Sequence, residues 1–237
     1  MLDIDNLQDN PRTREIVRTL VENQYNLNST AYSTEWLQKG EDREFHYLVA
    51  ASQELAEFMN SYWLPWWSKA ERDMANCRIE LVDSLHFLLS EMIIQYGRDN
   101  AVEEISTSYD AAEFVWANIK DEAANVPNHV IELARSTIMS VNADACDEES
   151  PLELTPFFLL CLAIDFPLEK LSALYMGKST LNKFRQDNGY KQGTYKKKWD
   201  GVKEDNYYLS EWIGALSTPP SVEEIRTWLE TEYAKYK

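Results

Sequence analysis

Glycine, proline, cysteine and positive charge are all scarce in this 237-residue chain. Its 7 glycines and 8 prolines are too few for a fibrous or loop-rich protein, and their scarcity favours long helices. The 3 cysteines, Cys77, Cys146 and Cys161, lie far apart without CxxC spacing, so neither a disulfide framework nor a zinc site is indicated. A formal charge of −17 would repel nucleic acid and anionic membranes, so we expect no nucleic-acid partner.

A long hydrophobic run is also missing. The most apolar stretch, LTPFFLLCLAI at 154–164, is much shorter than the roughly 20 residues that span a bilayer. The acidic start, MLDIDNLQDNPRTR, lacks the basic-then-apolar order of a secretory signal. We therefore expect no membrane partner and, with the cysteine pattern, a cytoplasmic location.

Apolar residues recur mostly at helical spacing, and the β-branched alternation of strands is nearly missing. The pattern predicts an all-α helical bundle that forms a single domain over 1–237, with a possible helical insert at about 98–150. The acidic stretch 141–151 is expected to be a loop, and Gly97 is expected to end a helix. The expected helices cover residues 12–29, 42–64, 70–96, 101–124, 128–142, 151–164, 167–187, 205–215 and 220–235.

Two carboxylate pairs stand in otherwise uncharged segments. Between Glu44 and Lys69, the 24 residues 45–68 contain only two formal charges, Glu54 and Glu57. A second pair, Glu80 and Asp83, lies in the apolar stretch RIELVDSLHF at 78–87. Spacing of i, i+3 places both members of a pair on the same face of a helix.

The two expected helices are consecutive, and a short connection usually makes such helices antiparallel neighbours. Their four carboxylates would then converge, and repulsion would force them to take up protons or cations. Hard divalent cations, chiefly Mg²⁺, suit oxygen ligands. The sequence therefore predicts a metal site between these helices, against the alternative that such pairs occur by chance on exposed helices.

Positive charge is concentrated in one segment, GKSTLNKFRQDNGYKQGTYKKKWDGVKEDN at 177–206. Residues 178–203 contain eight Lys or Arg against two Asp, and 177–201 contains four of the seven glycines. Basic side chains on flexible turns, with the hydroxyls of Tyr190 and Tyr195, can surround a polyphosphate. The alternatives are a solvated basic loop or an arm that binds an acidic partner. An acidic metal site and a basic loop together suit metal-assisted cleavage of a phosphoanhydride.

Three motifs resemble those of the dimeric all-α dUTPases in the MazG-like nucleoside triphosphate pyrophosphohydrolase superfamily. They are ELAEF, IELVDSLHF and the long box GKSTLNKFRQDNGYKQGTYKKKWDG followed by EDN, and the resemblance covers roughly residues 20–206. It implies a homodimeric enzyme that uses two or more Mg²⁺ ions per site. Such an enzyme hydrolyses dUTP, and in many members dUDP, to dUMP with release of pyrophosphate or phosphate.

The resemblance also implies roles for individual residues. It makes Glu54, Glu57, Glu80 and Asp83 the Mg²⁺ ligands, and Glu54 or Glu57 the group that helps to activate the attacking water. It places at the phosphates Lys178, Arg185, Tyr190, Lys198 and one of Lys196 and Lys197. It places near the nucleoside Gln24, Asn28, Trp36, His86, Phe87, Asn182 and Asn206. Spacing alone would make His86 a buried histidine with its hydrogen bonds satisfied.

The segment NQYNLNSTAYSTEW at 23–36 departs from the family pattern. It retains Gln24, Asn28 and Trp36 but has Ala31 and Tyr32 where members of the family have Asn-Gly. Because this segment contributes to reading the base, hydrolysis of dCTP as well as dUTP, or of a broader range of pyrimidine nucleotides, is an alternative. A rival from another class is a non-catalytic helical interaction protein, whose acids serve solubility and whose basic loop docks a partner.

Overall fold

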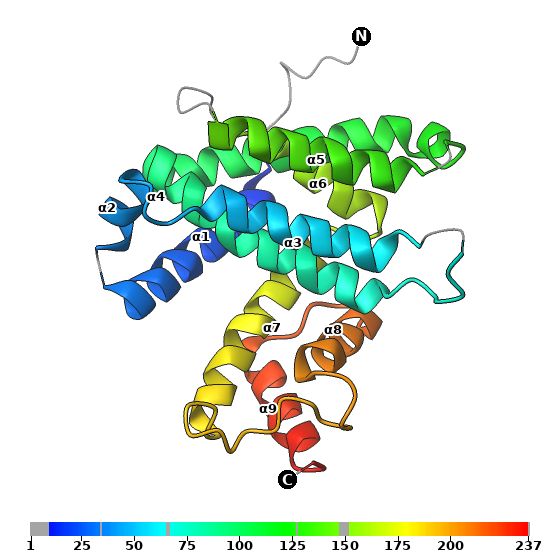
Figure 1. Cartoon of the computed structure of the whole chain (residues 1–237). Coiled ribbons are helices and arrows are strands. Elements are labelled where there is room, and N and C mark those ends of the chain that lie inside the picture. Colours follow the sequence, from blue (N-terminus) through cyan, green and yellow to red (C-terminus); the bar gives the residue numbers. More distant parts are fainter. Residues whose placement is uncertain (1–9, 34, 65–66, 127, 147–151, 237) are drawn as a thin grey trace.

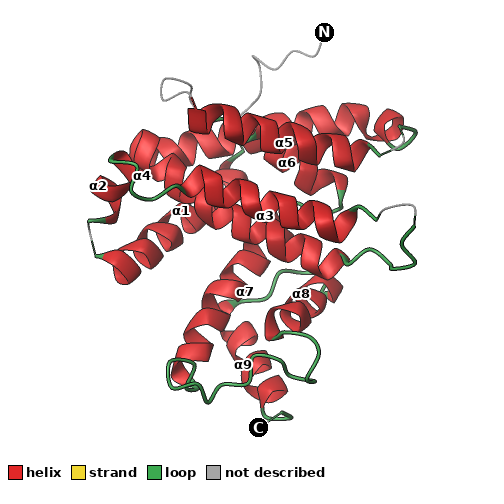
Figure 2. Ribbon diagram, in the orientation of Figure 1, coloured by secondary structure: helices red, strands yellow, loops and turns green. Residues whose placement is uncertain are grey.

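The computed structural model describes residues 10–33, 35–64, 67–126, 128–146 and 152–236. These residues form nine α-helices and no strand, which confirms the predicted all-α class (Figure 2). In chain order they are α1 Pro11–Tyr32, α2 Trp36–Glu41, α3 Tyr47–Tyr62, α4 Met74–Ala123, α5 His129–Cys146, α6 Thr155–Ala163, α7 Leu168–Asp187, α8 Asp205–Ala215 and α9 Val222–Tyr233.

The observed helix bounds lie within about four residues of the predicted ones, except at the start of α3. Helix α8 has the predicted bounds, and α4 is interrupted at Gly97, which has φ 72° and ψ 165°. The expected loop at 141–151 is wrong for 141–146, which continue α5, because Val141 is 2% exposed and extends the buried face of that helix. Residues 147–151 lie outside the described part of the chain.

The short helix α2 was not predicted, and the helix expected at 42–64 begins only at Tyr47. Helix α2 has six residues, too few to show a clear periodicity, and it includes Gly40. A Cβ atom at Gly40 would lie 2.1 Å from Cδ1 of Ile94, so this glycine allows α2 to pack closely against α4. The fully buried Trp36 fixes the start of the helix in the core.

Helices α3 and α4 are antiparallel neighbours, as predicted from their short connection (Figure 1). The amide of Asp73, just before α4, donates to the carbonyl of Ser61 near the end of α3 at 3.2 Å. One face of α3 and the facing side of α4 form the centre of the hydrophobic core. This core includes the fully buried Ala51, Leu55, Phe58, Leu81, Leu85 and Leu88.

Helices α7, α8 and α9 form a separate layer beneath α3 and α4 in Figure 1, while α5 and α6 lie on the opposite side. Helices α7 and α8 approach closely at Gly177, where a Cβ atom would lie 2.9 Å from Cδ1 of Ile213. The segment that joins α7 to α8 contains most of the basic residues noted above. In the described ranges, no helix combines the length and the apolar character needed to cross a membrane.

Candidate active site

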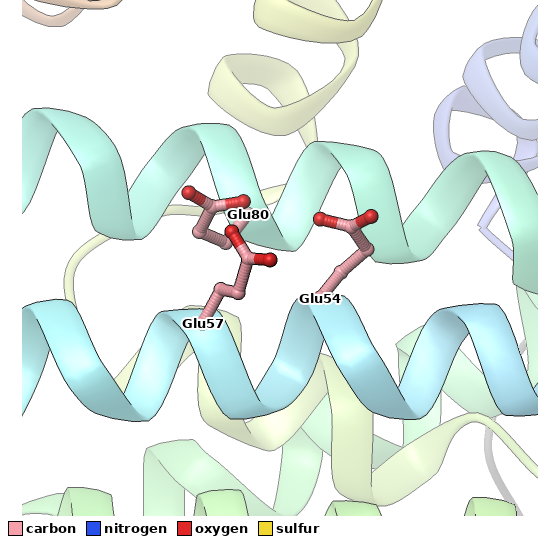
Figure 3. Close-up of side chains that lie close together, drawn as sticks. All are labelled: Glu54, Glu57 and Glu80. Carbon is pink, nitrogen blue, oxygen red and sulfur yellow. The ribbon is translucent and has the colours of Figure 1, made fainter.

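Three carboxylates meet across the α3–α4 contact (Figure 3). Glu54 and Glu57 come from α3 and Glu80 from α4, and one oxygen of each lies within 4.8 Å of the others. Glu80 is 6% exposed, Glu54 is half-buried and Glu57 is exposed. The i, i+3 pair of α3 therefore meets the first acid of the second pair, as the spacing predicted.

Asp83 does not join this group of three in the described structure. Both of its carboxylate oxygens are paired with Nζ of Lys178 on α7. Lys178 is only 8% exposed, so α7 presents a buried cation at the edge of the acidic group. A predicted phosphate ligand and a predicted metal ligand thus neutralise each other.

Burial and mutual repulsion change the acidity of the group. Burial, followed by the charges of Asp83, Glu54 and Glu57, raises the pKa of Glu80 to about 8, while Lys178 opposes the rise. Burial and the same repulsion also raise the pKa of Glu54. Asn76 Nδ2 donates to Glu80 Oε1 at 2.7 Å and fixes the orientation of that carboxyl group. Such a group retains a proton near neutral pH unless a cation replaces it.

The acids open into a cavity of ≈ 390 Å³ between the α3–α4 pair and the start of α8. Asn206, expected near the nucleoside, lines this cavity. Several other lining residues were not predicted, although Asn76 lies one helical turn before Glu80. These residues are Asp73, Asn76, Ile79, Lys203, Glu204 and Tyr207.

A short hairpin, residues 197–205, forms the wall of the cavity opposite the acids. The amide of Asp205 donates to the carbonyl of Lys197 at 2.9 Å, and the amide of Trp199 to that of Lys203 at 3.2 Å. Its turn is closed by Asp200, whose side chain accepts from the amide of Lys203 at 2.7 Å. At the tip, Gly201 has φ 82°, a value that favours glycine.

The 197–205 hairpin brings Lys203 to the cavity. Its Nζ lies 3.2 Å from the ring centroid of Tyr207 and 3.8 Å from Oδ2 of Asp73. Lys197, on the other arm, pairs with Glu204 at 2.7 Å. Lys203 is therefore, after Lys178, a second cation that the basic segment directs towards the acidic group.

Asp205 anchors the base of the hairpin from a fully buried position. Its carboxylate accepts from Nε of Arg185 at 2.9 Å and from the hydroxyl of Tyr195 at 2.7 Å. Nη1 of Arg185 donates to Oδ1 of Asn182 at 3.1 Å. Arg185, expected at the phosphates, is thus held within the protein by Asp205, a residue in the quoted EDN motif that the sequence analysis left without a role.

A family model described as dUTPase matches residues 16–190. The chain belongs to the all-α dUTPase family. No curated protein matches it. The predicted resemblance is confirmed, and membership makes the chain a dUTP-hydrolysing enzyme, not a non-catalytic interaction protein. The match ends before the 197–205 hairpin, α8 and α9.

The other residues of this dUTPase-family protein that were expected to contact the substrate phosphates do not line the cavity. Lys196 Nζ donates to the carbonyl of Tyr236 at 2.9 Å, and the backbone of Lys198 forms an antiparallel β-bridge with that of Glu204. Tyr190 is 44% exposed, with its ring 6.3 Å from that of Tyr195. Their roles at the phosphates stay predictions.

A buried polar network connects residues of α1 and α4 that were expected near the nucleoside of the substrate. Gln24 Oε1 accepts from Tyr175 Oη at 2.7 Å and lies 2.8 Å from His86 Nδ1. Its Nε2 donates to Asn28 Oδ1 at 2.9 Å and to Ser90 Oγ at 3.0 Å. The Gln24 amide therefore makes its full complement of four hydrogen bonds inside the protein.

The network determines which nitrogen of His86 bears hydrogen. Ser90 donates its hydroxyl to the carbonyl of His86, so its Oγ accepts from the amides of Gln24 and Asn28. Gln24 consequently presents oxygen to Nδ1 of His86, which must donate. Burial, with Lys178 as a second cause, lowers the pKa of His86 to about 3, so the ring is neutral. Nε2 is then an acceptor, and among the described residues it is buried without a hydrogen-bond partner.

Trp36 and Phe87 have different environments. Trp36 is fully buried and donates from Nε1 to Ser29 Oγ at 3.2 Å. Phe87 is half-buried, with its ring 6.5 Å from that of Tyr47. Trp36 therefore stabilises the packing of α2 against α1. Phe87 lies on α4, directly after His86.

Proposed function

We propose that the acidic cavity hydrolyses the anhydride between the α- and β-phosphates of dUTP in a Mg²⁺-dependent reaction that yields dUMP and pyrophosphate. The same site would convert dUDP to dUMP and phosphate. The observation that carries the proposal is the convergence of Glu54, Glu57 and Glu80 within 4.8 Å, opposite the hairpin that bears Lys203. Family membership supports dUTP as the substrate.

The donor set suits Mg²⁺. Carboxylate oxygens are hard ligands. Burial and then the charges of Asp83, Glu54 and Glu57 raise the pKa of Glu80, and a divalent cation would relieve that repulsion. Glu54, Glu57, Glu80 and Asp83 would hold two or more ions, because four carboxylates carry more charge than one ion neutralises. When bound, the metal would neutralise phosphate charge and lower the pKa of a bound water.

The protein side chains supply the rest of the proposed mechanism. Glu54 or Glu57 accepts a proton from the attacking water, since both lie in the group of three acids at the cavity. Lys178 and Lys203 stabilise the phosphates, because one is held at Asp83 and the other lies beside Tyr207 at the cavity wall. The other proposed phosphate contacts are Arg185, Tyr190, Lys196 and Lys198. The ion pair with Asp205 fixes the orientation of the Arg185 guanidinium.

The nucleoside would bind through Phe87, Asn182, Asn206 and the Nε2 acceptor of His86. A buried acceptor without a partner favours a ligand that presents a donor there, as the uracil imide and the deoxyribose hydroxyl both can. Gln24, Asn28 and Trp36 would support this site from behind. The Gln24 amide makes all its hydrogen bonds inside the protein, so it has no group left to distinguish uracil from cytosine. Hydrolysis of dCTP as well as dUTP, or of a broader range of pyrimidine nucleotides, is therefore the second candidate.

We also propose a homodimer. Val49 of α3 and Met139 of α5 are 49% and 68% exposed. They lie near the place where Ser52 Oγ donates to Asn142 Oδ1 at 2.8 Å, so the two apolar side chains belong to one region of the surface. Sedimentation of the wild type and of Met139→Glu tests this surface. A wild type that sediments as a monomer contradicts the homodimer.

A substrate panel tests the function. Product release from dUTP, dUDP, dCTP and dTTP is measured with Mg²⁺ and with chelator. We expect Mg²⁺-dependent release from dUTP and dUDP, which Glu54→Gln and Glu57→Gln abolish without unfolding the protein. Equal rates with dCTP favour the second candidate. Wild-type rates in both variants would refute the site.

A further inference from the structure

The outer face of the 197–205 hairpin is enclosed by aromatic side chains from the C-terminal end of the chain. Trp199 is 4% exposed, and its ring lies 5.9 Å from that of Trp228, 6.1 Å from that of Tyr233 and 5.7 Å from that of Tyr236. Trp228 and Tyr233 belong to α9, and Tyr236 follows it. The hairpin thus packs on α9 through its own tryptophan.

Polar contacts add to this packing just before the hairpin. The amide of Lys196 donates to Oη of Tyr233 at 3.1 Å, and Nζ of Lys196 donates to the carbonyl of Tyr236 at 2.9 Å. The ring of Tyr195 stacks on that of Tyr233 at 4.7 Å and 28°. Two consecutive residues of the basic segment are therefore fixed by α9 and the residues after it.

The opposite face of the same hairpin contributes Lys203 and Glu204 to the acidic cavity. None of the described residues that line this cavity comes from α9. Tyr195 also connects to Asp205 through its hydroxyl, and Asp205 holds Arg185. A displacement of α9 would therefore move cavity residues, although α9 itself does not line the cavity.

We propose that α9 is a positioning element of the nucleotide site, with Tyr233 as its central positioning residue. It fixes the 197–205 hairpin so that Lys203 faces the phosphates of the bound nucleotide and Asn206, which directly follows the hairpin, faces its nucleoside. The inference rests on the proposed function, because it takes the acidic cavity as the place of the phosphates. The family match ends at residue 190, so it assigns no role to α9.

The experiment compares Tyr233→Ala, which removes the ring and the hydroxyl, with Tyr233→Phe, which keeps the ring. The matched control is Trp116→Ala, because Trp116 stacks on His129 at 6.4 Å between α4 and α5, outside the cavity lining. For each protein we would measure kcat and KM for dUTP, affinity for a dUTP analogue with an imido group between the α- and β-phosphates, affinity for Mg²⁺ alone, and folding by circular dichroism.

We expect Tyr233→Ala to lose ~10- to 100-fold in kcat/KM, since a displacement of about 1 Å at a reacting site has such an effect. Analogue affinity should fall with it. Affinity for Mg²⁺ alone should stay within about twofold, because the acids lie on α3 and α4 and not on the hairpin. Tyr233→Phe should recover most of the activity, and Trp116→Ala should behave as the wild type.

A folded Tyr233→Ala protein with wild-type kcat, KM and analogue affinity overturns the inference. An equal loss of Mg²⁺ and analogue affinity also overturns it, because that result indicates general disruption. If Tyr233→Ala does not fold, a chain that ends at Lys235 replaces it, because that chain lacks the Tyr236 ring that packs on Trp199 and the Tyr236 carbonyl that accepts from Lys196. A lower kcat/KM with wild-type Mg²⁺ affinity supports the inference, and wild-type kcat and KM overturn it. Failure of the wild type to hydrolyse any pyrimidine nucleotide refutes the proposed function instead.

Discussion

Asp205 and Arg185 form a two-pronged ion pair across the contact between α7 and α8, with Nε of Arg185 2.9 Å from Oδ2 of Asp205. The carboxylate is fully buried and the side chain of Arg185 is 13% exposed. This pair fixes the end of the basic segment against the helix that presents Asn206 to the cavity.

Replacing Asp205 by Asn should be strongly destabilising. The substitution leaves the Arg185 guanidinium buried without its counter-charge, and breaking one side of a buried pair costs about 3–5 kcal/mol. Urea unfolding measures the loss. Asp187→Asn, at an exposed position on α7, should change the unfolding free energy by less than about 0.5 kcal/mol. Equal stabilities of the two variants would show that the pair has no structural importance.

The contribution of Glu80 to the stability of the metal-free protein should fall as the pH rises from about 4.5 to about 8. Glu80 has a pKa raised to about 8 in the folded state, against an ordinary value of 4.5, so the folded protein holds a proton that the unfolded chain releases in this window. The melting temperature in chelator, recorded between pH 6.5 and 8, checks the direction, because His86 makes no opposing contribution above pH 6.5. Glu80→Gln should flatten this dependence, and an unchanged slope in that variant would assign it to other groups.

His86 should remain neutral, with hydrogen on Nδ1, throughout the range in which the protein is folded. Its pKa is lowered to about 3 by burial, so folding stability should be lost as the pH falls from about 6.5 towards 3, because the unfolded ring takes up a proton first. Long-range ¹⁵N–¹H correlation spectra identify the tautomer. A ring that titrates near pH 6.5, or one protonated on Nε2, would contradict the hydrogen-bond network.

Gly177→Ala should lower both stability and activity. The added Cβ atom would lie 2.9 Å from Cδ1 of Ile213 and 3.2 Å from Cδ2 of Leu209, so these side chains or the two helices must shift, at a cost of about 1–3 kcal/mol. The neighbouring Lys178 would move relative to Asp83. Thermal unfolding and kcat/KM for dUTP measure the two effects. Lys183→Ala, at an exposed position on the same helix, should preserve both quantities.

The sequence predicted those parts of the molecule that depend on local spacing. The pairs Glu54 and Glu57, and Glu80 and Asp83, were recognised from i, i+3 spacing, and the helix at 205–215 was predicted with its observed bounds. The antiparallel arrangement of α3 and α4 followed from their short connection.

Features that depend on distant contacts could not be read from local spacing. The pairing of Asp83 with Lys178 joins residues 95 positions apart, and the role of Asp205 depends on the packing of α7 against α8. Helix α2 is held by Trp36 in the core and by the close approach of Gly40 to Ile94. Residues 141–146 remain helical because Val141 is buried, although the local composition is acidic.

The most direct test of the central claim is a calorimetric titration of Mg²⁺ into metal-free protein, for the wild type and for the double variant Glu54→Gln/Glu80→Gln. The wild type should bind Mg²⁺. The double variant should lose affinity by more than ~10-fold while its melting temperature stays equal or rises, because neutral amides relieve repulsion among the carboxylates. A wild type that takes up no Mg²⁺, or a double variant that binds it with unchanged affinity, would contradict the account.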